Sequence, residues 1–208
     1  MSVRVDRVVT SGIFSLDGQD FEVDNNVWLV GDDEEVLIVD AAHDAATILE
    51  AVAGRRVVGI VCTHSHNDHV NAVQDLLSET QAPVYLHPAD TMLWEVVNAG
   101  VAFTPLADGD VITVAGTQAQ VIHTPGHSPG GVCIYVPNQH VLLSGDTLFH
   151  GGPGATGRSF SDFPTILDSI RERLLTLPAD TRVLTGHGDE TTIGSESSAY
   201  DDWVARGH

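Results

Sequence analysis

The 208-residue sequence contains no lysine, and nine arginines stand against 29 acidic residues, which leaves a formal net charge of −20. Proteins that bind nucleic acid through its phosphates need a basic patch, and a chain this acidic does not favour one. The same charge disfavours attachment to an anionic membrane surface. We therefore expect neither nucleic acid nor a membrane as a partner.

Cysteine and long apolar runs are also scarce. Cys62 and Cys133 are the only cysteines, and each lies in an apolar stretch, so we expect two buried thiols and no disulfide framework. No apolar run approaches the roughly 18 residues of a membrane span, and no apolar signal segment follows the N-terminal arginines. These absences predict a cytoplasmic protein. The length favours a single domain over residues 1–208.

Apolar periodicity predicts strands and helices in both halves of the chain. Strands are expected at residues 3–9, 27–30, 36–39, 57–62, 84–86, 111–114, 118–123, 132–136, 141–143 and 182–184, and those within the first forty residues are expected to be antiparallel. Helices are expected at residues 47–53, 70–77, 89–97, 165–175 and around 195–206, with a Gly- and Ser-rich surface loop at residues 150–163. Two sheets packed face to face, with helices outside, would satisfy this α/β pattern.

Four side chains of the metal-binding type fall within six residues, between His64 and His69. In His64-Ser65-His66 the two imidazoles lie on the same side of an extended backbone, because side chains alternate along it. Asp68 and His69 follow in what we expect to be a tight turn. Imidazole and carboxylate suit zinc or iron, and four such groups this close would repel or desolvate one another without a shared metal.

Three further candidate ligands each follow an apolar, β-branched run and lie in a turn-rich segment. This is where a functional side chain stands at the end of a buried strand. The complete set of candidate metal ligands is His64, His66, Asp68, His69, His127, Asp146 and His187. Seven donors are too many for one tetrahedral ion, so the set predicts two ions.

A carboxylate has two oxygens, and we expect Asp146 to bridge the two ions. The first ion would be held by His64, His66 and His127, and the second by Asp68, His69 and His187. Two divalent ions roughly 3.5–4 Å apart would hold a bridging hydroxide near neutral pH, ready to attack a carbonyl carbon. Asp68 is expected to orient this hydroxide and carry its proton onward. Zinc is the expected metal, with iron or manganese as alternatives.

Other polar residues have weaker signals. Asp40 ends a predicted strand, where it either orients the turn of a metal-binding histidine or forms an ordinary Asx turn. His150 and Arg158 lie in the Gly-rich loop, where substrate contacts are common. The histidines without a place among the ligands are expected to be surface or hydrogen-bonded side chains; these are His43, His87, His123, His140, His150 and His208.

The pattern His64-x-His66-x-Asp68-His69, with the later His127, Asp146 and His187, resembles the signature of the metallo-β-lactamase fold superfamily. This resemblance covers nearly the whole chain and implies a four-layer αβ/βα sandwich with the metals at the sheet edge. Residues 143–149, 157–163, 174–183 and 186–194 are similar to the glyoxalase II-like branch, which hydrolyses thioesters such as S-lactoylglutathione. The segment Asp40-Ala41-Ala42-His43 replaces that branch's Asp, small residue and Gly.

The ligand set and the resemblance together favour a dinuclear metallo-hydrolase of a small thioester. Such a centre keeps a net positive charge, which favours an anionic substrate. Full-length glyoxalase II has a further helical domain for glutathione that this chain is too short to hold, so glutathione, mycothiol and other thiols stay open. The alternatives are a persulfide dioxygenase with one iron at His64, His127 and Asp146, a lactone or β-lactam hydrolase, and a metal-binding interaction domain without turnover.

Overall fold

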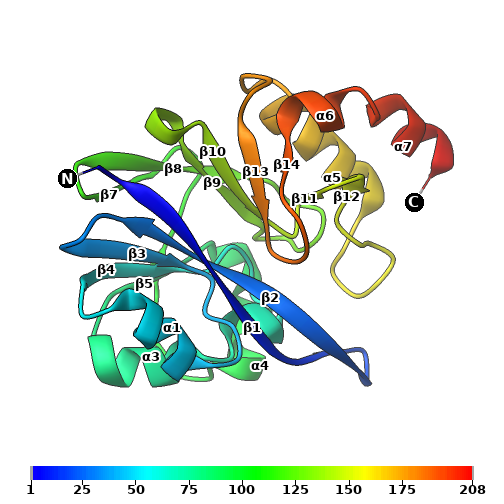
Figure 1. The fold of residues 1–208 in the computed structure, drawn as a ribbon. Coiled ribbons are helices and arrows are strands. Elements are labelled where there is room, and N and C mark those ends of the chain that lie inside the picture. Colours follow the sequence, from blue (N-terminus) through cyan, green and yellow to red (C-terminus); the bar gives the residue numbers. More distant parts are fainter. Residues whose placement is uncertain (1, 208) are drawn as a thin grey trace.

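The computed structural model describes residues 2–207 and contains two six-stranded sheets packed face to face, with helices on both outer faces (Figure 1). The first sheet has the order β1-β2-β3-β4-β5-β6, so neighbours in sequence are neighbours in the sheet. The second has the order β14-β13-β10-β9-β8-β7, and a small separate ribbon pairs β11 with β12. The predicted four-layer αβ/βα sandwich is confirmed.

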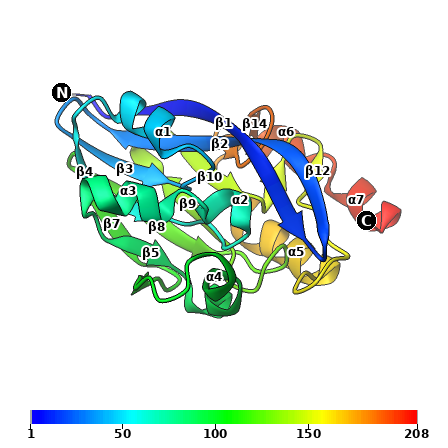
Figure 2. The same cartoon turned by 90° about the horizontal axis from the view of Figure 1, so that it is seen from below.

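The first sheet starts with a long hairpin and continues with shorter parallel strands. Its strands are β1 (Arg4–Leu16), β2 (Gln19–Gly31), β3 (Glu35–Val39), β4 (Arg56–Val61), β5 (Val84–Leu86) and β6 (Thr104–Pro105). Strands β3 to β6 pair in parallel, which requires crossover connections. These connections contain α1 (Ala45–Val52), α2 (Asn67–Val70), α3 (Val73–Thr80), the 3-10 turn η1 (Pro88–Asp90) and α4 (Thr91–Val97), shown in Figure 2.

The second sheet is antiparallel except for one central pair. Its strands are β7 (Val111–Val114), β8 (Thr117–His123), β9 (Val132–Val136), β10 (Val141–Gly145), β13 (Arg182–Thr185) and β14 (Thr191–Thr192). Strands β10 and β13 run in parallel. The remaining elements are the 3-10 turn η2 (Pro137–Gln139), the ribbon β11 (Leu148–Phe149) and β12 (Gly152–Pro153), α5 (Phe163–Ser169), the π-helical turn η3 (Ile170–Leu174), α6 (Ile193–Ser197) and α7 (Tyr200–Arg206).

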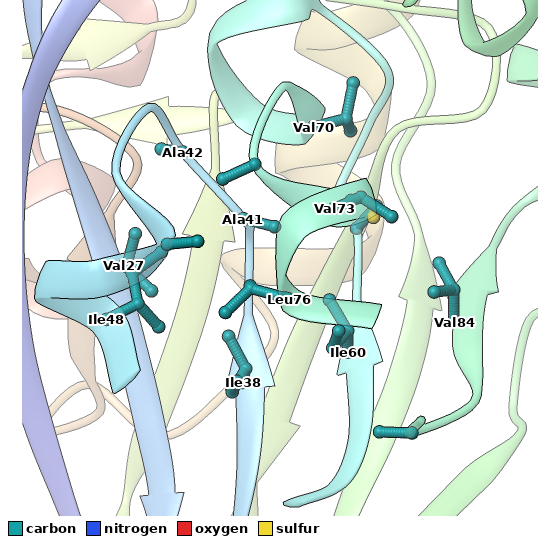
Figure 3. Packing of buried hydrophobic residues seen from close by; sticks show 14 of the residues in the cluster. Val27, Ile38, Ala41, Ala42, Ile48, Ile60, Val70, Val73, Leu76 and Val84 are labelled. Carbon is teal, nitrogen blue, oxygen red and sulfur yellow. The ribbon is translucent and has the colours of Figure 1, made fainter. Parts of the chain in front are cut away.

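Side chains alternate along the central strands and thereby fill three hydrophobic layers. In β3, Ile38 packs toward the helices of the first sheet, whereas Leu37 packs between the two sheets. Figure 3 shows Ile48 of α1 and Leu76 of α3 beside Ile38 in the outer layer. A one-residue slip would exchange these faces, and each fully buried side chain of this kind contributes about 1.5–3 kcal/mol, so the register is strongly specified.

Several boundaries differ from the sequence prediction. The first strands are antiparallel, as predicted, but the first hairpin continues to the pair Leu16↔Gln19, well beyond the residue 9 expected for the end of its first strand. The predicted helix at 70–77 is divided between α2 and α3, and that at 165–175 passes from α5 into η3. The C-terminal helix is likewise two helices, and β6, β11, β12 and β14 were not predicted. Strand β12 lies within the segment 150–163 that was expected to be a loop.

Cys62 and Cys133 are buried free thiols, as predicted. Within residues 2–207, the structure contains no helix that is both long enough and apolar enough to cross a membrane.

Candidate metal centre

All seven predicted donors meet at one edge of the sandwich, in the segments that follow β4, β8, β10 and β13. Their nitrogen and oxygen atoms form three overlapping groups within 4.8 Å. The groups are His64, His66 and His127; His64, His69 and Asp146; and Asp68, His69 and His187. Four segments far apart in sequence therefore place their donors around one centre.

The segment after β4 changes from extended to helical within a few residues. His66 lies on extended backbone and His64 lies in a bend, and their rings are nearly perpendicular with centroids 4.7 Å apart. The predicted tight turn at Asp68 and His69 is a turn of helix α2, in which His69 N donates to the His66 carbonyl at 3.0 Å. Asp68 and His69 are both buried by this turn.

Backbone carbonyls determine the tautomers of two of the histidines. His127 Nδ1 donates to the Ala155 carbonyl at 2.8 Å, and His187 Nδ1 donates to the Asp24 carbonyl at 2.8 Å. A carbonyl only accepts, so Nδ1 carries the proton in each ring. In the neutral imidazoles, Nε2 is therefore the nitrogen with a free lone pair, and it is Nε2 that faces the centre.

Asp40 organises two further histidines, one of them through Thr63. Its carboxylate accepts hydrogen bonds from Thr63 N at 2.7 Å, Thr63 Oγ1 at 2.9 Å and His69 Nδ1 at 2.9 Å. Because the Thr63 hydroxyl proton is given to Asp40, its oxygen accepts from His64 Nδ1 at 3.1 Å. Both rings thus direct Nε2 toward the centre, and we propose on these contacts that Asp40 orients His64 and His69.

The histidine nitrogens that face the centre are closer to one another than is favourable for lone pairs that share no proton or cation. His66 Nδ1 lies 3.0 Å from His64 Nε2 and 2.9 Å from His127 Nε2. A single proton can bridge only one of these contacts, whereas a shared cation satisfies every lone pair at once. Within residues 2–207, the buried oxygens Asp68 Oδ1 and Asp146 Oδ1 also have no hydrogen-bond partner. The donor set therefore fits divalent metal ions.

Burial and charge act in opposite directions on the titratable groups. Burial lowers the pKa of His66 to about 3, and the charge of His127 adds to this effect. Burial also disfavours a charged His187, but Asp146 outweighs it and raises the pKa of His187 to about 10. Burial would raise the pKa of Asp68, yet its positive neighbours hold it at about 2. In the metal-free protein, the histidines that share a donor group with Asp68 are therefore protonated, and they lie between ionised carboxylates.

Asn25 contacts the donors and was not predicted. Its Nδ2 donates to Asp68 Oδ2 at 3.0 Å, and its Oδ1 accepts from His43 Nε2 at 2.9 Å. His43 Nδ1 in turn accepts from Asn71 Nδ2 at 3.1 Å. The only signal in the sequence is the pair Asn25-Asn26 beside an apolar run. The structure shows that this pair lies in strand β2 and that both amides are buried. His43 is hydrogen-bonded, as expected for a histidine outside the ligand set.

Asp90 connects the segment that follows β4 to the one that follows β8, and it was also missed. Its carboxylate is completely buried. Asp90 Oδ2 accepts from Ser65 N at 3.0 Å and from Ser128 Oγ at 2.8 Å, and Oδ1 accepts from Gly130 N at 2.5 Å. In the sequence this residue resembles an ordinary acid at the start of a helix, so its distant partners could not be recognised.

Gly186 lies where no larger residue fits. A Cβ atom at this position would stand 2.2 Å from Asp146 Oδ1 and 2.8 Å from His69 Cε1. The Gly186 carbonyl accepts from Asn26 N at 2.7 Å, and the Thr185 carbonyl accepts from Asn26 Nδ2 at 3.0 Å. These bonds join β2 of the first sheet to the end of β13 in the second, directly beside the donors.

The other histidines lie away from the donor groups. His87 and His123 stack with their centroids 4.0 Å apart, and His140 and His150 are exposed. His208 lies outside the described residues.

A four-layer sandwich with a His-rich site of the dimetal type at its edge defines the class of metallo-hydrolases. The chain belongs to the metallo-beta-lactamase superfamily, whose family model matches residues 21–187. The family expected from the ligand pattern is thereby confirmed.

Relatives and solved structures agree with this assignment. The chain is 35% identical over 186 residues to the probable metallo-hydrolase YqgX of Bacillus subtilis, covering 82% of this chain and 88% of the relative. It is 30% identical over 188 residues to the hydroxyacylglutathione hydrolase GloC of Haemophilus influenzae, covering 82% and 89%. The crystal structure of TTHA1623 in a di-iron-bound form is similar with a TM-score of 0.76 and 35% identity, covering 84% of this chain and 93% of that chain.

Proposed function

We propose that the protein is a dinuclear metallo-hydrolase that cleaves a small acyl thioester. The observation that carries this proposal is the convergence of five imidazoles and two carboxylates on adjacent donor groups at the sheet edge. The similarity to the hydroxyacylglutathione hydrolase GloC supports a thioester as the substrate. The similarity to the probable metallo-hydrolase YqgX supports hydrolysis as the reaction.

Two of the three overlapping donor groups support the two sets expected from the sequence. The first ion would be held by His64, His66 and His127, and the second by Asp68, His69 and His187. Asp146 Oδ2 lies 3.6 Å from His127 Nε2 and 3.4 Å from His187 Nε2. Its Oδ1 lies 3.4 Å from His69 Nε2, so the carboxylate stands between the sets as a bridging ligand would. Zinc and iron both suit these donors, and the di-iron relative supports iron.

Bound divalent ions would supply Lewis acidity and lower the pKa of water toward neutrality. The contacts of Asp68 support its role in orienting the attacking water, because Asn25 holds its Oδ2 while its Oδ1 has no hydrogen-bond partner within residues 2–207. The water oxygen forms a bond to the carbonyl carbon, and the C–S bond breaks. One water proton passes by way of Asp68 to the departing thiolate, and the other leaves as the new carboxylic acid ionises.

The test is metal quantitation combined with a thioester panel on the purified protein. Protein loaded with zinc, iron or manganese is expected to hold about two ions per chain and to release thiol from S-lactoylglutathione or another small acyl thioester. Asp146→Ala is expected to lose metal and turnover together. Asp75→Ala, an exposed acid on α3, is the matched control and should change neither.

The panel also separates the alternatives. Metal-loaded protein that leaves every acyl thioester intact would overturn the proposal. Oxygen uptake with glutathione persulfide would identify a dioxygenase instead, and turnover confined to lactones or β-lactams would identify a hydrolase of another ester or amide class. Two bound ions without any turnover would favour an interaction domain.

A further inference from the structure

A small apolar pocket opens beside the first donor group. It is lined by Phe14 and Leu16 of β1, by His66 and His127, and by Ala155 and Arg158 of the Gly-rich loop. Phe14 and Leu16 share one face of β1 because side chains alternate along a strand, and the Phe14 ring lies 5.5 Å from the His66 ring. One end of the pocket is therefore formed by proposed metal ligands and the walls by the hairpin and the loop.

Arg158 stands exposed at this pocket without a carboxylate in ion-pair contact. Its guanidinium lies over the Phe21 ring at 5.0 Å from the centroid, and Nη1 donates to Gln19 Oε1 at 3.3 Å. Among residues 2–207, no carboxylate lies within ion-pair distance of Arg158, although the chain holds 29 acidic residues. By contrast, Arg171 and Arg173 are paired with aspartates. Asp17 acts on this guanidinium only from beyond ion-pair distance, and a guanidinium beside the donors with no carboxylate in contact is suited to bind an anion.

The loop that carries Arg158 is held against the hairpin tip, and Figure 2 shows the two segments side by side. Ser159 Oγ donates to Asp17 Oδ1 at 2.8 Å, and Ser159 N donates to Asp17 Oδ2 at 3.3 Å. Arg158 N donates to Ser161 Oγ at 3.1 Å. The backbone on both sides of Arg158 is thereby anchored, so its position at the pocket is preorganised.

We infer that Arg158 binds a carboxylate of the substrate, and that the pocket holds the short aliphatic chain between this carboxylate and the thioester. The inference rests on the proposed thioester hydrolysis and adds the class of substrate. The apolar walls of Phe14 and Leu16 suit a few methylene groups, and the guanidinium matches a carboxylate with two parallel hydrogen bonds. The reacting carbonyl then lies at the His66 and His127 end of the pocket.

Three small thioesters test the inference and show which half of the substrate carries the carboxylate that Arg158 binds. S-acetyl thioglycolate carries a carboxylate on the thiol half, S-succinyl mercaptoethanol carries one on the acyl half, and S-acetyl mercaptoethanol carries none. Arg158→Gln is expected to raise KM for one of the two anionic thioesters about five- to tenfold, with kcat and the neutral thioester unchanged. The thioester that responds identifies the half that Arg158 binds. Arg171→Gln, exposed and remote, is the matched control.

A second measurement does not depend on turnover. Levulinate is S-acetyl thioglycolate with a methylene group in place of sulfur, and it cannot be hydrolysed. If the thiol half is bound, calorimetry should show levulinate binding to the wild type and weaker binding to Arg158→Gln. If the acyl half is bound, the ketone analogue of S-succinyl mercaptoethanol should behave in this way instead.

The failure of the inference and the failure of the proposed function give different results. Equal wild-type KM values for all three thioesters, or an Arg158→Gln effect that is the same for the neutral one, would overturn the inference and leave thioester hydrolysis intact. No turnover of any thioester would overturn the proposed function. If no thioester is turned over and neither analogue binds, the carboxylate site is overturned as well. If an analogue binds and Arg158→Gln weakens its binding, the carboxylate site is supported.

Discussion

His43 holds the amide of Asn25 through a hydrogen bond of 2.9 Å between His43 Nε2 and Asn25 Oδ1. Asn71 Nδ2 donates to the other nitrogen of the ring, so the imidazole proton lies on Nε2. Asn25 must therefore turn its oxygen to His43 and its NH2 group to Asp68. A row of three side chains thus orients the proposed catalytic carboxylate.

Removing this row is expected to slow turnover more than it weakens substrate binding. Asn25→Ala deletes the donor to Asp68 Oδ2, and loss of such a supporting contact lowers activity about ten- to hundredfold. His43→Ala should act in the same direction but more weakly, because Asn25 keeps its place in β2. Steady-state kinetics of metal-loaded variants, with metal content measured in parallel, would check this. His140→Ala, exposed and paired with Asp180, is the control.

Metal binding is expected to release protons. In the metal-free protein Asp146 outweighs the effect of burial, and the pKa of His187 rises from its ordinary 6.5 to about 10. The pKa of His69 is raised well above the same ordinary value against a similar effect of burial. Both imidazoles must lose a proton to bind a cation, so loading at neutral pH should release about two protons. Calorimetry in buffers of different ionisation enthalpy counts them directly.

The sign of the pH dependence follows from the same pKa shift. The folded metal-free protein binds the His187 proton more tightly than the unfolded chain does, so this stabilisation is complete below pH 6.5 and is lost toward pH 10. Protons compete with metal over that interval, and metal affinity should rise with pH. His187→Asn should reduce the proton count by about one. An affinity that falls between pH 7 and pH 9 would contradict the expectation.

Asp90 is expected to support both the fold and the first donor group. Asp90→Ala leaves Ser65 N, Ser128 Oγ and Gly130 N as buried donors without their acceptor, which should lower the free energy of unfolding by about 3 kcal/mol or more. Urea denaturation of the metal-free protein would measure this loss. Because the His66 and His127 segments are no longer joined, metal content should fall toward one ion per chain. Unchanged stability and metal content would contradict this role.

The donor residues could be recognised from the sequence because their signal is local. His64, His66, Asp68 and His69 stand within one short segment, and each later donor follows an apolar run that ends in a turn. Continuous apolar runs also predicted the layers correctly, since buried side chains on both faces of β3 and β10 require neighbours on both sides.

The supporting residues could not be recognised, because their partners lie far away in sequence. Asn25 contacts Asp68 across 43 positions, and Asp90 contacts Gly130 across 40. The full length of the first hairpin was missed for another reason. Its outer half extends beyond the sheet core, where few apolar side chains are buried, so the alternation that marks a strand is weak there.

Each donor set draws on both sheets. His66 comes from the first sheet and His127 from the second, and Asp68 and His187 divide in the same way. A bound ion would therefore act as a covalent-like crosslink between the two halves of the chain, closing loops of 61 and 119 positions by the residue numbers. A chelator should then do more than stop catalysis. It should convert a slow-unfolding, protease-resistant protein into one whose halves separate readily.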